Sequence, residues 1–120
     1  MNRTILFFIF VLAVNLSAKT TFVSGTEDLP LMPGLQAISD TVIFDKPDGR
    51  VITNEFTASI SPKEISAFYK NVLPNLGWTC SQDNPTSLIF VRDRDQLTIQ
   101  YRVGTKATTV TIEITPVNSK

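Results

Sequence analysis

The chain has 120 residues, with 11 basic and 11 acidic side chains and therefore no formal net charge. The basic side chains are scattered rather than clustered, which argues against nucleic acid as a partner. Histidine is absent, which excludes catalytic triads that use imidazole and most zinc sites. The sequence accordingly predicts no catalytic residue, no metal site, no cofactor and no enzymatic activity.

The N-terminus has the pattern of an export signal. Arg3 precedes an apolar run at 5–14, which is shorter than the roughly 20 apolar residues of a membrane-spanning helix but suits a secretory signal. Ser17 and Ala18 are small, so we expect a signal peptide at 1–18, export to the periplasm and no stable membrane span afterwards. The alternative is an uncleaved N-terminal tether. Lipid attachment is not expected, because the one cysteine, Cys80, lies far from the run.

An apolar, proline-rich segment opens the mature chain. In DLPLMPGL, at 28–35, Pro30 and Pro33 oppose a regular helix or central strand, and Gly34 suits a tight turn. We expect an extended segment at 19–40, followed by a single helix-on-sheet domain at 41–116 and a tail at 117–120. The large side chains of the motif either cover the sheet or form a preformed surface for a partner protein; these interaction candidates are Leu29, Leu31, Met32 and Leu35.

A β-hairpin is predicted at 41–60. Two β-rich runs flank the turn sequence KPDG at 46–49. In the second run, apolar and polar residues alternate, and Asn54 interrupts the apolar face, which indicates a bulge or an exposed strand end. Asp45 and Asp48 could hold a calcium ion, but turn formation explains them better. Arg50 is placed for a surface ion pair with Asp45.

A helix is predicted to begin after Ser61. Ser61 is a suitable N-cap, Pro62 suits the first helical position, and Glu64 can complete a capping box. The helix should end at or just before Leu73, because Pro74 follows. An apolar stripe that must pack on a sheet is formed by Ile65, Phe68, Tyr69, Val72, Leu73 and Leu76.

Four more strands are predicted at 78–81, 86–92, 96–103 and 108–115, with a turn at 82–85. The last two alternate cleanly between apolar and polar residues, which is typical of a sheet covered on one side only. Short connections indicate antiparallel neighbours. The predicted fold is α+β: a single antiparallel sheet, in the order β-β-α-β-β-β-β, with one helix packed across its apolar face.

Three further sets of residues could bear on function. Cys80 shares the face of Trp78 and is expected to be a small buried residue. The charges at 92–95, RDRD, should form a solvated, self-neutralising turn. Phe56, Tyr69 and Trp78 either pack in the core or line a cleft between helix and sheet that binds a small apolar ligand.

Three motifs carry a resemblance. DLPLMPGL, FDKPDGR and FYKNVLPNLGW, taken in order, resemble a family of small uncharacterised exported proteins of Gram-negative bacteria. This resemblance implies export and a single domain, and it implies no activity. The capped helix followed by antiparallel strands is also similar in architecture to the helix-on-sheet repeats of outer-membrane assembly lipoproteins, although the lipidation cysteine is missing here.

The sequence therefore predicts a non-enzymatic periplasmic module of the cell envelope with an accessory or protein-interaction role. Its partner would be an envelope protein, bound through an exposed strand edge or through the DLPLMPGL surface. The alternative is a carrier of a small apolar ligand. The identity of the partner and the oligomeric state do not follow from the sequence.

Overall fold

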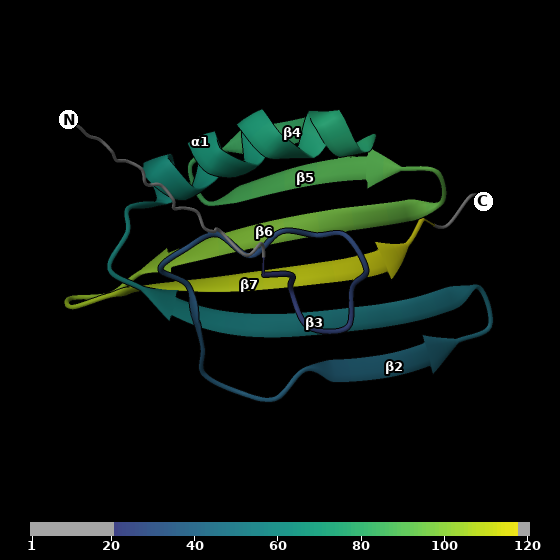
Figure 1. The fold of residues 1–120 in the computed structure, drawn as a ribbon, viewed down its shortest axis with the longest axis horizontal. Helices are drawn as coiled ribbons and strands as arrows, with labels where there is room; N and C mark the ends of the chain where they lie inside the picture. Colours follow the sequence, from purple (N-terminus) through teal and green to yellow (C-terminus); the bar gives the residue numbers. More distant parts are fainter. Residues whose placement is uncertain (1–20, 118–120) are drawn as a thin grey trace, which may run out of the picture.

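The computed structural model describes residues 21–117, so the predicted signal peptide at 1–18 lies outside the described residues. It has the predicted α+β fold, with one antiparallel sheet and one helical segment (Figure 1). A two-residue strand, which the sequence pattern does not predict, precedes the expected hairpin, so the order is β-β-β-α-β-β-β-β. The strands are β1 (Gln36–Ala37), β2 (Val42–Lys46), β3 (Gly49–Ala58), β4 (Thr79–Asn84), β5 (Ser87–Arg92), β6 (Asp95–Val103) and β7 (Thr108–Pro116).

Strands β4 to β7 form an antiparallel meander, and one crossover through the helix connects β3 to β4. The spatial order of the sheet is β1-β3-β7-β6-β5-β4, and β2 also pairs with β3, on the same edge as β1. After β3 the chain crosses to the far edge through the helix, and β4 to β7 return strand by strand until β7 lies beside β3. This crossover keeps the helix against one face of the sheet (Figure 1).

The predicted alternation of β6 and β7 is confirmed. Ile99 lies opposite Ile112, and both are buried, whereas Thr98 lies opposite Glu113 on the other face and is only partly covered. Residues that face each other across antiparallel strands share one side of the sheet. One apolar face therefore forms the core, as the period of two requires.

The helix begins and ends where the sequence predicts. The Ser61 hydroxyl accepts a hydrogen bond from the Glu64 amide at 3.2 Å, and α1 runs over Pro62–Val72. A 3₁₀ turn, η2 (Leu73–Leu76), continues it to Gly77, which takes a left-handed φ of 94° that favours glycine. The side chains that α1 and η2 bury are Ile65, Tyr69 and Leu73.

The N-terminal segment covers the rest of the apolar face. In Figure 1 it loops in front of β6, β7 and β3, beside the helix. Val23, Leu29 and Leu35 are buried in the same core as the helix, and Leu31 and Met32 pack partly buried against it. Residues 21–35 are thus an integral layer of the domain.

The predicted end of the strand at 78–81 and the predicted turn at 82–85 were wrong. The strand expected at 78–81 continues to Asn84, past an irregularity in register between Cys80 and Gln82. The turn falls at Pro85 and Thr86 because the Asn84 side chain accepts from the Thr86 and Ser87 amides at 3.2 and 2.9 Å.

Asn54 marks neither a bulge nor an exposed end. It is buried in an unbroken ladder opposite Ile112. Its side chain is satisfied there, because it accepts from the Thr41 hydroxyl at 2.6 Å and donates to the Ser24 carbonyl at 2.9 Å. Asn54 therefore helps to hold the N-terminal segment on the sheet.

Candidate functional site

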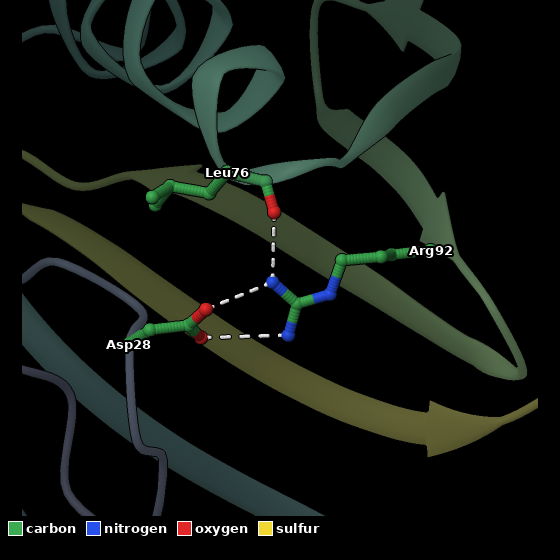
Figure 2. A network of polar contacts seen from close by, with 3 residues as sticks. All are labelled: Asp28, Leu76 and Arg92. Atoms are coloured by element: carbon green, nitrogen blue, oxygen red, sulfur yellow. Dashed lines mark hydrogen bonds and ion pairs between the residues drawn. The ribbon is translucent and has the colours of Figure 1, made fainter.

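Arg92 joins three separate parts of the chain (Figure 2). Its guanidinium donates to the Asp28 carboxylate at 2.9 and 3.4 Å, and to the Leu76 carbonyl at 2.9 Å. Its central carbon also lies 4.4 Å from the centroid of the Trp78 ring. The prediction that the charges at 92–95 neutralise one another is wrong for Arg92, whose acidic partner lies in the N-terminal segment. This cluster is structural, because its charges are already paired.

The three ligand-cleft candidates are core residues. Phe56, Tyr69 and Trp78 are all buried. Trp78 borders a small hollow of about 250 Å³ beside Asp28 and Arg92, and its indole N–H has no partner within the described residues. Neither Phe56 nor Tyr69 lines this hollow or the two larger ones described below. The space between helix and sheet is filled by side chains.

Tyr69 attaches the N-terminal segment to the helix. Its hydroxyl donates to the Pro30 carbonyl at 2.8 Å and accepts from the Met32 amide at 3.1 Å. Burial raises the pKa of this phenol from 10.0 to about 12. Tyr69 is therefore a neutral, fully engaged anchor rather than an acid or base.

The four interaction candidates divide into two pairs. Leu29 and Leu35 are 1% and 6% exposed, so they offer a partner almost no surface. Leu31 and Met32 are half-buried and border a hollow of about 430 Å³ with Phe68. The motif mainly covers the sheet, and it exposes only part of its apolar surface.

A wider groove lies between α1 and the β4–β5 turn. It has a volume of about 610 Å³, and Tyr101 lines it together with Lys70 and Asp83. The Lys70 ammonium donates to Asp83 at 2.7 Å, and this bond raises the pKa of Lys70. A lysine held in its charged form cannot act as a nucleophile or general base. Lys70 is therefore not an activated nucleophile or base in this groove.

Cys80 is exposed, so the prediction that it is buried is wrong. It does lie opposite the buried Phe90, on the face that the helix covers. However, β4 is the last strand of the sheet, so in the described part of the chain no further strand lies beside Cys80.

The predicted ion pair at the first hairpin is confirmed. The Arg50 side chain donates to Asp45 at 3.1 Å, and both side chains are exposed, so the pair contributes little to stability. Within residues 21–117, no group of three or more carboxylates and thiols is arranged to hold a metal ion.

The most unusual surface is the free edge of β2; the sequence predicts binding through an exposed strand edge but does not identify the strand. Val42, Ile43 and Phe44 are 59%, 49% and 60% exposed. β2 pairs with β3 on one side, and in the described part of the chain no strand pairs with its other side. A signal was present, because three successive apolar residues in a short strand cannot all point into one core.

Comparison of the chain with models of protein families, with curated proteins and with solved structures finds no match. In residues 21–117 there is no helix with the length and apolar character needed to cross a membrane. A functional proposal must therefore be argued from the exposed residues of the structure itself.

Proposed function

We propose that the protein is a non-enzymatic, protein-interaction module of the bacterial cell envelope, and that it binds by adding a strand to the free edge of β2. The observation that carries this proposal is the exposure of Val42, Ile43 and Phe44 on an unpaired edge strand. The periplasmic location rests on the predicted signal peptide at 1–18.

An edge strand of this kind is well suited to binding protein. Its outward N–H and C=O groups can pair with an extended segment, and alternate side chains can then contact it on both faces. Folded proteins usually protect such edges with charge, proline or a covering loop, because exposed apolar edges associate with other chains. β2 lacks this protection over its first three residues, which favours a binding role.

The chemistry of the rest of the molecule supports a role without catalysis. The chain has no histidine, and Lys70 and Tyr69 are held in their protonated forms. We do not favour the carrier alternative, because Phe56, Tyr69 and Trp78 are buried in the core and do not together line a cleft.

A pull-down from periplasmic extract tests the proposal with matched variants. Phe44→Asp places a charge on the edge strand at an exposed position, so the fold should persist. Val103→Asp is the control, because Val103 is 67% exposed and lies at the end of β6, away from β2. We expect native protein and Val103→Asp to recover the same partner and Phe44→Asp to lose it. Equal recovery by all three would refute the role of β2.

A further inference from the structure

The backbone groups of β2 that remain free can be assigned from its pairing. Lys46 and Gly49 flank a two-residue turn and pair with each other, so Lys46 directs its N–H and C=O toward β3. The Glu55 carbonyl accepts from the Ile38 amide at 3.0 Å on this same side of β3, which agrees with that assignment. The alternate residues of β2, Ile43 and Asp45, therefore direct their backbone groups outward.

We propose that the strand added to β2 is β2 of a second copy of this chain, in antiparallel orientation with Ile43 opposite Ile43 of the other copy. This inference rests on the proposed function, because it names the partner of the same edge. The two sheets would become one continuous sheet related by a twofold axis.

Side-chain complementarity selects this register. With Ile43 at the centre, Val42 of one copy lies opposite Phe44 of the other, and Lys46 lies opposite Asp40. Val42, Ile43 and Phe44 are exposed, as are Asp40 and Lys46, and neither Asp40 nor Lys46 forms an ion pair within residues 21–117. The dimer would bury the apolar residues and pair the charges at both ends of the added strand.

Two other registers, with the twofold axis moved toward the turn, are worse. A twofold axis at Phe44 would place Asp45 opposite Ile43 and Lys46 opposite Val42, which brings each charge against an apolar residue. An axis at Asp45 would place the two Asp45 carboxylates opposite each other, which is destabilising. Because β2 has only five residues, the interface is small, and we expect a reversible dimer whose population rises with protein concentration.

Disulfide trapping tests the register. Ile43→Cys and Asp45→Cys are each made in a Cys80→Ser background, which removes the exposed native thiol. In the proposed register the two copies of position 43 form a hydrogen-bonded pair, with Cα atoms about 5.5 Å apart, which a disulfide can bridge. The two copies of position 45 would be about 14 Å apart. We expect a covalent dimer from Ile43→Cys and none from Asp45→Cys; equal trapping, or none at position 43, would overturn the proposal.

Sedimentation velocity of the native chain and its charge variants gives an independent test. Lys46→Asp should weaken association about tenfold, because it places a carboxylate at position 46 opposite Asp40, and Asp40→Lys together with Lys46→Asp should restore association. A native chain that stays monomeric, or a double variant that is no better than the single one, contradicts the second copy as partner. The proposed function would survive that result if Phe44→Asp still loses its partner in the pull-down.

Discussion

The guanidinium carbon of Arg92 lies 4.4 Å from the centroid of the Trp78 ring. The same guanidinium binds the Asp28 carboxylate and the Leu76 carbonyl, so one side chain connects the N-terminal segment, the end of the helix and β5 (Figure 2). Leu76 is the last residue of η2, and a cation there also satisfies a carbonyl that has no partner within the helix.

Replacing Arg92 with alanine should therefore cost more than the loss of one surface ion pair. We expect Arg92→Ala to lower the free energy of unfolding by about 2–3 kcal/mol, because it removes charge-assisted hydrogen bonds and the contact with Trp78. Asp28→Asn is the matched control and should cost about 1 kcal/mol or less, since the Asp28 side chain is 47% exposed. Urea denaturation measures both; equal losses would mean that Trp78 and Leu76 add nothing.

Local patterns account for most of the fold that could be predicted. The helix start depends on Ser61 and Pro62, which act on their own neighbours, and the core face of β6 and β7 follows from alternation around Ile99 and Ile112. Such signals need no knowledge of distant residues. They fail at Asn84, whose side chain shifts the turn by capping it.

The Arg92 cluster and the free edge of β2 were harder to predict, because both depend on where distant parts of the chain lie in the fold. Arg92 and Asp28 are separated by 64 positions in the sequence, so nothing near Arg92 reveals its partner. Similarly, composition does not show that β2 and β4 lie at the edges of the sheet. Edge position is what exposes Cys80, which the sequence pattern places among buried residues.

Tyr69 should stabilise the protein through its hydroxyl. Tyr69→Phe leaves the Pro30 carbonyl and the Met32 amide without their partner, and we expect a loss of about 1–2 kcal/mol in the free energy of unfolding. The amide of Met32 should also exchange faster with solvent, because the N-terminal segment is less firmly attached. Unchanged exchange at Met32 by NMR would show that the hydroxyl does not hold the segment.

Removal of the Tyr101 hydroxyl, unlike that of Tyr69, should not destabilise the protein. The Tyr101 hydroxyl is buried and has no hydrogen-bond partner within residues 21–117, so it has lost its hydration without compensation. Tyr101→Phe should therefore leave stability unchanged or raise it by about 1 kcal/mol. Urea denaturation beside Tyr69→Phe provides the comparison, and a loss as large as that of Tyr69→Phe would mean that the nearby Ser66 satisfies the Tyr101 hydroxyl.

Stability should fall at alkaline pH in a manner that depends on Tyr69. The pKa of this phenol is 10.0 in an unstructured chain and about 12 in the folded protein, so the folded state retains its proton more tightly than the unfolded chain. Its contribution is fully present below pH 10 and is lost as the pH rises toward 12. Burial also raises the pKa of Tyr101, which adds to the same trend.

The variant Tyr69→Phe isolates this effect. Below pH 10 it should be less stable than the native protein, and the difference should shrink as the pH rises from 10 toward 12, because only the native protein then loses the contribution of Tyr69. Urea midpoints measured across this range give the comparison, with Tyr101→Phe as a control that retains Tyr69. If the difference between native protein and Tyr69→Phe stays constant with pH, the Tyr69 phenol does not titrate differently in the folded and unfolded states.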